Sequence, residues 1–331
     1  MRGKAQLLCL SALALAACGG GGGGGGGDPP PPAPAPSPPP PAPTRLYTVP
    51  AQEALTSADV ERVIAQGVAE ARARNLPATL AVVDRVGNVL AVFTMTGANP
   101  RLAVPRGPNG STHDLQGVDV PGAVAGAIAK AVTGAYLSSA GNAFSTRTAS
   151  MIVQEHFPPS SATRGLESGP LFGVQFSQLP CSDLARRFAG TAGADAFIGP
   201  KRSPLGLAAD PGGFPLYKNG VVVGGVGVMA DGLYGFDPEV RDLDQDGEEA
   251  IAFAAAQGFA APDTIRAERI SVDGTLLRFS DIVAADLRAS GPPPAFATLS
   301  GRAGALTSVR GYYDAAGGVL AGRAHGSEAS G

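Results

Sequence analysis

Hydrophobic positions near the start of the folded part recur at helical spacing. Apolar residues return every three to four positions across residues 60–71, which predicts a helix with one buried face. Thr56 or Ser57 can cap its first turn, because their hydroxyl oxygens accept hydrogen bonds from unpaired backbone N–H groups. Asn75 marks its end.

The next segment, Leu76–Met95, consists of two apolar runs joined at a polar turn. Its only charges, Asp84 and Arg85, stand beside that turn, and it contains no His, Cys or Ser. The pattern predicts a buried β-hairpin, which can serve as a scaffold or as the wall of an apolar pocket. For Asp84, a role in stabilising the turn is favoured over catalytic base chemistry.

A second helix is predicted at residues 122–141, "GAVAGAIAKAVTGAYLSSAG", which are rich in small residues. Gly126 and Gly134 inside it each cost roughly 1 kcal/mol of helix stability relative to alanine. Such a cost indicates that something approaches this helix closely. The partner can be another backbone or a flat ligand.

Farther along the chain, helical and hairpin patterns alternate. Residues 145–157 and 247–259 predict helices, and "YKNGVV" and "SVDGTL" predict hairpins with Asn-Gly and Asp-Gly turns. A Gly-rich strand pair is expected near residues 308–322, whereas residues 97–121 contain too much Gly, Pro and Asn for regular structure. The order predicts an α+β domain, an antiparallel sheet flanked by helices with inserted loops and a C-terminal β extension.

The N-terminal region predicts export. Residues 1–17 have a basic start and an apolar run too short to span a bilayer, as in a signal peptide. The sequence Leu-Ala-Ala-Cys ending at Cys18 resembles a bacterial lipobox, although an ordinary secretory cleavage site remains open. Residues 18–44 form a Gly- and Pro-rich tether, which suits a lipid anchor in the cell envelope, and Gly19 after the cysteine favours the outer membrane, facing the periplasm.

Composition narrows the possible partners. The chain has 25 Lys and Arg against 28 Asp and Glu and no basic patch, so nucleic acid is not an expected partner. A hydrophobic content of 44% is enough for a large core. Once Cys9 leaves with the signal peptide and Cys18 carries lipid, Cys181 stands alone, so the mature chain can form no intramolecular disulfide. Cys181 is read as a small buried hydrophobe, with a haem or redox role as the alternative.

Four stretches carry a resemblance to a known family. They are "LTSADVERVIAQGVAEARARNLPATLAVVDRVGNVLAVFTMTGA", "AIAKAVTGAY", "GGFPLYKNGVVVGGVGV" and "QDGEEAIAFAAAQGF". Together they resemble the GlcG/HbpS family of haem-binding proteins. The resemblance implies a profilin-like fold, homo-oligomers and, in some members, a bound haem near a Lys-Ala-x-Thr segment, matched here by Lys130 and Thr133. This chain departs from the family by insertions at about 98–120, 158–210 and 230–244 and by an extension at 262–331, within a domain of residues 45–331.

Three histidines, His113, His156 and His325, are available for metal chemistry. No two of them have the i, i+4 spacing of a zinc site. His156 is the best candidate for a haem-iron ligand, because imidazole is the common axial ligand. Its alternative role is to pair with the C-terminal end of the third helix. Lys130 is likewise either a solvated or paired lysine or a ligand contact.

An acidic run precedes the last helix. Asp242, Asp244 and Asp246 followed by Gly247 match the first half of a calcium-binding EF-hand loop. The twelfth position, where that loop needs a bidentate glutamate, is Phe253, so Glu248 or Glu249 would have to substitute. The alternative is an acidic N-terminus that stabilises the helix dipole.

No catalytic motif is complete. The sequence contains no nucleophile elbow and no GxxxxGK[ST] loop, and the glycines of "GGVGV" lie inside a strand rather than between strand and helix. We therefore expect a membrane-tethered envelope protein that binds a small ligand, with haem as the leading candidate. A structural or interaction module without haem is the alternative, and an envelope enzyme acting on a small organic ligand is the second alternative.

Overall fold

The computed structural model describes residues 51–106, 110, 116–159, 165, 167–172 and 205–309. All of them belong to the second of two compact units, Pro50–Gly331. The signal peptide, Cys18, the tether, Cys181, His113 and His325 lie outside the described residues.

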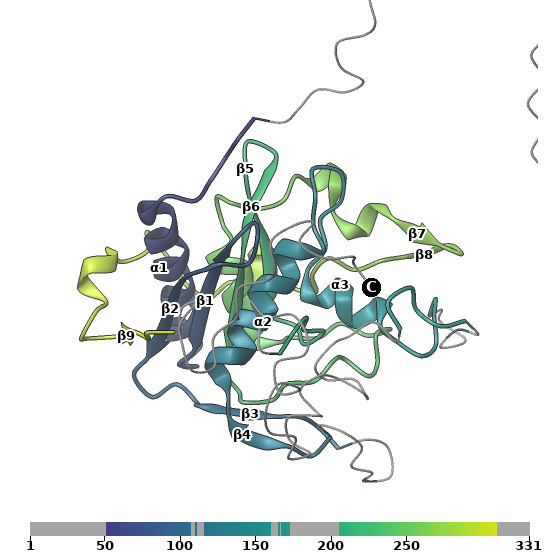
Figure 1. Ribbon diagram of the computed structural model, residues 1–331, viewed down its shortest axis with the longest axis horizontal. Helices are drawn as coiled ribbons and strands as arrows, with labels where there is room; N and C mark the ends of the chain where they lie inside the picture. Colours follow the sequence, from purple (N-terminus) through teal and green to yellow (C-terminus); the bar gives the residue numbers. More distant parts are fainter. Residues whose placement is uncertain are drawn as a thin grey trace, which may run out of the picture. The chain divides into compact units, whose positions relative to one another are not determined.

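A five-stranded antiparallel sheet forms the centre of this unit (Figure 1). Its order is β5-β6-β1-β2-β9, so the predicted hairpins at Leu76–Met95 and at the Asn-Gly turn each supply a neighbouring pair of strands. The strands are β1 Thr79–Asp84, β2 Val89–Met95, β5 Gly213–Lys218, β6 Val221–Met229 and β9 Gly304–Leu306. With the helices described next, the sheet confirms the predicted α+β class.

Both faces of the sheet are buried. Successive side chains of a strand point to opposite sides, so one strand contributes to two cores. Leu80 and Val82 of β1 join the core cluster that contains α1 and α5, whereas Ala81 and Val83 join the cluster that contains α2. This double burial explains why the Leu76–Met95 segment is almost continuously apolar. The helices are α1 Ser57–Ala73, α2 Ala123–Tyr136, α3 Thr146–Ile152 and α5 Gly247–Ala255.

The small residues of α2 allow it to pack directly on the sheet (Figure 1). A Cβ added at Gly134 would lie 2.6 Å from the carbonyl carbon of Phe214 in β5, and one at Gly126 would lie 3.0 Å from the Met229 side chain. Both glycines therefore serve a close helix–sheet contact. Of the two predicted reasons, the structure shows a backbone neighbour at Gly134, while Gly126 faces side chains of the sheet.

Local signals in the sequence predicted several element boundaries correctly. Thr56 is the N-cap of α1 and forms a capping box with Asp59. Asp84 accepts hydrogen bonds from the backbone N–H groups of Val86 and Asn88, which confirms its predicted role in the turn. The β5–β6 turn residue Asn219 has φ +50°, the left-handed conformation that an Asn-Gly turn requires.

Two sequence predictions need correction. The stretch 97–121 is not wholly irregular, because β3 (Arg101–Ala103) pairs with β4 (Asp119–Pro121). This pairing buries Leu102 in the core beneath α2. The third helix is also shorter than predicted: α3 ends at Ile152, with Val153 as its C-cap.

The C-terminal extension adds a small hairpin and one strand of the main sheet. The predicted Asp-Gly hairpin is β7 (Ser271–Val272) paired with β8 (Thr275–Leu276). β9 pairs with β2 and so forms an edge of the sheet, while most of the strand pair expected near 308–322 lies outside the described residues. The described part of the extension also contains four 3-10 helices, Asp263–Ile265, Ala267–Arg269, Ala284–Asp286 and Phe296–Thr298. Within the described ranges, no helix has the length and apolar character needed to cross a membrane.

Candidate functional site

Lys130, predicted to contact a ligand, lies in the interior of the protein. It sits in the middle of α2, and its side chain is completely buried. The ammonium lies 2.5 Å from the carboxylate of Asp210 and forms a second ion pair with Glu248. It also donates a hydrogen bond of 2.7 Å to the backbone carbonyl of Pro211. All three groups that contact the ammonium, two carboxylates and one carbonyl, belong to the protein's own chain.

Glu248 connects three elements around that ammonium. It stands in the first turn of α5, where a negative charge is stabilised by the helix dipole. One carboxylate oxygen binds Lys130. The other accepts hydrogen bonds from the backbone N–H groups of Ala230 and Asp231, just after β6. The pair therefore joins α2, α5 and the end of β6.

One ammonium serves two carboxyl groups in this cluster, and the charges are unbalanced. Burial alone would lower the pKa of Lys130, but Asp210 and Glu248 together outweigh burial and raise it, so the lysine stays charged. Burial raises the pKa of Asp210 to about 7, because Lys130 offsets only part of the cost of desolvation. Burial also raises the pKa of Glu248. The cluster therefore takes up a proton near neutral pH.

Thr133 lies one turn along α2 from Lys130 and is also completely buried. Its hydroxyl donates to the carbonyl of Ala129 and accepts from the backbone N–H of Ala208, each at 2.7 Å. The segment 205–213 thus covers both residues, through Ala208 over Thr133 and through Asp210 over Lys130. The two residues share a face of α2, as predicted, but that face is occupied by the chain.

A second buried ionic cluster surrounds Arg147 of α3. Its guanidinium lies 2.8 Å from Glu249 of α5 and 3.0 Å from Asp237. It also lies 2.8 Å from the partly exposed Asp244 and 3.5 Å from Asp281. Burial alone would lower the pKa of Arg147. Glu249, Asp244 and Asp237 outweigh burial and raise the pKa above its ordinary value, so the guanidinium remains charged. The cluster ties α3 to α5 and to the chain on either side of α5.

The calcium site predicted at Asp242, Asp244 and Asp246 is not supported. Asp244 pairs with Arg147, and Asp246 is the N-cap of α5, where it accepts a hydrogen bond from the Glu249 N–H. Among the described residues, no group of three or more His, Cys, Asp or Glu is arranged to hold a metal ion. The acidic run serves the start of a helix and a buried arginine, so its carboxylates do not converge on one point.

Of the three residues predicted to bind haem, His156 is the one on the surface. Because α3 ends at Ile152, His156 lies beyond the helix in an exposed stretch and does not sit at its last turn. Its ring forms no hydrogen bond or ion pair within the described part of the chain. Its exposure contrasts with the complete burial of Lys130 and Thr133.

Sequence reasoning missed most of the buried ionic residues. Arg147 stands in "TRTASMI", where nothing marks it as buried, and its partner Glu249 is 102 positions away. Glu248 and Glu249 carried a signal as an acidic helix start, but their partners did not. One signal could have been used: Glu248 and Glu249 stand directly beside an apolar helical run. Charged residues in such a place are buried only when they are paired, so partners for both could have been expected.

A family model matches part of this domain. The model described as "Haem degrading protein HbpS-like" matches residues 55–103, which span α1, β1, β2 and β3. The resemblance to the GlcG/HbpS family is thereby confirmed, and this segment carries an HbpS-like sequence. No curated protein matches the chain.

Three solved structures are similar to the chain at low identity. A PduOC:heme complex is 17% identical, with 62% of this chain and 94% of that chain covered and a TM-score of 0.33. The ORFY protein of Klebsiella pneumoniae, family model DUF336, is 17% identical, with 66% and 100% covered and a TM-score of 0.34. HbpS is 20% identical, with 64% and 94% covered and a TM-score of 0.29. At such scores none of these structures bears on the function of this chain.

Proposed function

We propose that this protein is an HbpS-like ligand-binding protein of the cell envelope and that haem is its ligand. The observation that carries the proposal is the family match over residues 55–103, whose description names haem. The four stretches that resemble the family supply four of the five strands of the sheet, together with α1, α5 and most of α2, so the likeness concerns the scaffold that the family uses. Binding is proposed rather than turnover, because the sequence contains no complete catalytic motif.

Only part of the predicted residue set fits haem. The ammonium of Lys130 is bound by two carboxylates and a carbonyl, so it is not available to a propionate, and the hydroxyl of Thr133 is equally occupied. His156 does fit: its imidazole is exposed, has no protein partner in the described part of the chain, and is a common axial ligand of haem iron. Haem, when bound, would supply an iron centre, and His156 would hold it.

Absorption spectroscopy tests the proposal. Hemin is titrated into the purified full-length chain in detergent, with free hemin in the same detergent as the reference. A shifted Soret band that saturates at one hemin per chain supports haem binding. A spectrum equal to that of free hemin at every ratio overturns the proposal.

A second candidate function is a structural or interaction module of the envelope that binds no haem. The burial of Lys130 and Thr133 favours it, because the Lys-Ala-x-Thr segment of α2 is closed by Ala208 and Asp210. In this case Lys130 would serve only the fold. The hemin titration separates the two functions directly.

The proposal includes location and assembly. Lipid at Cys18 would anchor the chain, and the tether of residues 18–44 would hold the domain away from the outer membrane on its periplasmic side. We also propose a homo-oligomer, as the resemblance implies. Light scattering coupled to gel filtration measures this, and a monomer at micromolar concentration would contradict it.

A further inference from the structure

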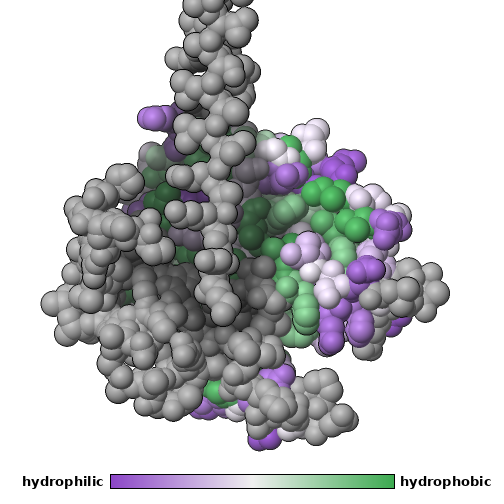
Figure 2. All heavy atoms as spheres, turned by 45° about the vertical axis from the view of Figure 1, so that its right-hand side comes forward, coloured by the Kyte–Doolittle hydropathy of each residue, from purple (hydrophilic) through white to green (hydrophobic). Residues whose placement is uncertain are grey.

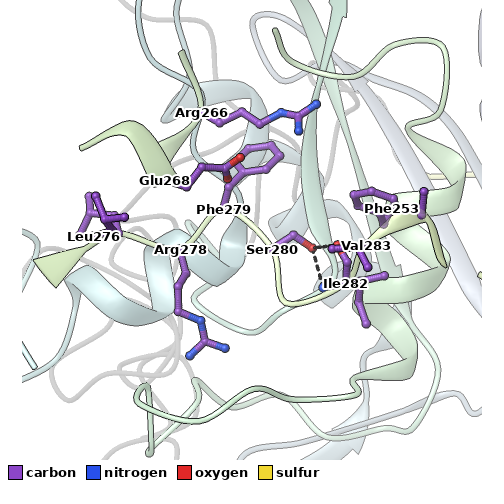
Figure 3. Close-up of a pocket in the computed structure, with 11 residues that line it drawn as sticks. Phe253, Arg266, Glu268, Leu276, Arg278, Phe279, Ser280, Ile282 and Val283 are labelled. Carbon is purple, nitrogen blue, oxygen red and sulfur yellow. Dashed lines mark hydrogen bonds between the residues drawn. The ribbon is translucent and has the colours of Figure 1, made fainter. Parts of the chain in front are cut away.

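A pocket of about 530 Å³ lies in the C-terminal extension, beyond the residues that the family model matches. Its volume falls within the range of roughly 300–1,000 Å³ typical of small-molecule sites. The side chains around it come from α5, from Arg266 and the 3-10 helix Ala267–Arg269 that follows it, and from the end of β8 and the chain after it (Figure 3). None of the residues predicted to bind haem lines it.

The floor of the pocket is apolar and held in place by the core. Phe253 and Phe279 both pack edge-to-face on Phe214 of β5, with ring centroids 5.9 and 5.5 Å apart. Leu277 and Ile282 are buried beside them. Since these side chains are fixed by neighbours inside the core, the floor needs little rearrangement to receive an apolar ligand.

The rim exposes further apolar surface. Leu276 and Val283 remain 57% and 56% exposed, although both are large hydrophobic residues. Figure 2, in which the side of the molecule carrying β7 and β8 comes forward, shows apolar patches among polar ones. A ligand with an apolar body would remove part of this surface from water, which is favourable at about 25 cal/mol per Å².

The two cationic side chains that line the pocket, Arg266 and Arg278, already form ion pairs within the protein. Arg266 pairs with Asp263 at 2.8 Å and stacks over Phe279 with 5.4 Å to the ring centroid. Arg278 pairs with Asp281 and donates 2.7 Å to the carbonyl of Val240, and Figure 3 shows its guanidinium pointing away from Phe279. Neither is free to neutralise an anionic ligand.

Glu268 is different. It lines the pocket, is half-buried, and forms no hydrogen bond or ion pair within the described part of the chain. Figure 3 shows it with Leu276 on one side of the pocket, while Phe253, Ile282 and Val283 lie on the opposite side. Because both arginines are neutralised by their aspartates, the unbalanced charge at the pocket is negative.

We propose that this pocket binds a hydrophobic organic amine, with the cationic nitrogen at Glu268 and the apolar body against Phe253, Leu277 and Ile282. The carboxylate supplies the charge partner, and the aromatic and aliphatic floor supplies the area. This site is separate from the proposed haem function and does not depend on it.

Three indoles that differ only in the head group test the proposal. Tryptamine is cationic, tryptophol is neutral and indole-3-acetate is anionic, and each is titrated into the full-length chain by calorimetry or by ligand-observed NMR. We expect tryptamine to bind about fivefold more tightly than tryptophol, the effect of a partly exposed ion pair, and indole-3-acetate to bind most weakly. Equal affinities, or no binding of tryptamine at millimolar concentration, overturn the proposal.

Variants locate the site. Glu268→Gln keeps the size of the side chain and should remove the preference for tryptamine, whereas Glu155→Gln, a matched change at an exposed glutamate outside the pocket, should keep it. Val283→Arg at the exposed rim should weaken tryptamine and tryptophol by occupying the pocket, and tryptamine the more because the added cation repels it. An unchanged tryptamine preference in Glu268→Gln overturns the proposal, whatever the outcome of the hemin titration.

Discussion

The ammonium of Lys130 forms an ion pair with the carboxylate of Glu248, so that the middle of α2 is joined to the first turn of α5 although the two residues are 118 positions apart. Asp210, in the segment that covers α2, forms an ion pair with the same ammonium. A buried pair of this kind costs most when one partner is removed, because the other charge stays behind without compensation.

We therefore expect Lys130→Met to lower the free energy of unfolding by roughly 3–5 kcal/mol. The substitution keeps the length of the side chain but leaves Asp210 and Glu248 without their cation. Urea denaturation measures the change. Lys218→Met is the control, because Lys218 pairs with Asp59 at a half-buried position and should cost only about 0–1 kcal/mol. Equal costs for the two variants would show that Lys130 is not a buried charge partner.

The raised pKa of Asp210 predicts an unusual dependence of the free energy of unfolding on pH. Its pKa is about 7 in the folded protein, against an ordinary value of 3.8 for the unfolded chain. Between these values the folded chain holds a proton that the unfolded chain has released, so the free energy of unfolding falls as the pH rises. The slope for one group is at most about 1.4 kcal/mol per pH unit.

Urea denaturation at several pH values between 4.5 and 7.5 measures this slope. Burial raises the pKa of Glu248, Glu249 and Asp237 as well, so these groups act in the same direction. Asp210→Asn should flatten the profile, because asparagine does not titrate. A stability that climbs steadily from pH 4.5 to 7.5, or a slope that Asp210→Asn leaves unchanged, would contradict the assignment.

Thr133 should behave as a core residue. Thr133→Val removes the hydroxyl that receives the Ala208 N–H and leaves that donor buried without a partner, which costs about 1–3 kcal/mol. Thermal unfolding measures the loss, and Thr96→Val at an exposed position is the control. If Thr133→Val unfolds like the wild type but fails to bind hemin, Thr133 faces a ligand and its placement in the core is wrong.

Much of the scaffold was predictable because its signals are local. The cap at Thr56, the turn carboxylate of Asp84 and the Asn219-Gly220 turn depend on residues within a few positions of one another. The side chains of β1 alternate between two cores, but in the sequence β1 is simply one apolar run. The run therefore indicated burial and did not indicate which helix covers which face.

The ionic interior was not predictable in the same way. Whether Lys130 points to solvent or to Asp210 depends on the path of a segment about 80 residues away, and Arg147 depends on chain both before and after α5. The short strand β3 was missed because its pairing with β4 crosses an insertion rich in turn residues. The pocket at Glu268 combines parts of the extension that carry no common motif.

Lipid attachment is expected at Cys18. Cys18→Ala removes the only acceptor in the lipobox, so the chain should move from the detergent phase to the aqueous phase in Triton X-114 partitioning of cell envelopes. Cys181→Ala, the matched change at the other cysteine of the mature chain, should leave partitioning unchanged. Retention of the Cys18→Ala chain in the detergent phase would place the anchor elsewhere.

Haem binding is tested most directly by a hemin titration of the full-length chain run in parallel with His156→Ala and with His325→Ala, a histidine control outside the described residues. We predict that the wild type and His325→Ala shift the Soret band to saturation at one hemin per chain, and that His156→Ala loses the shift because it lacks the exposed imidazole. A saturable shift retained in His156→Ala would assign the iron ligand to another residue. A wild-type chain that leaves the spectrum of free hemin unchanged would contradict haem binding altogether.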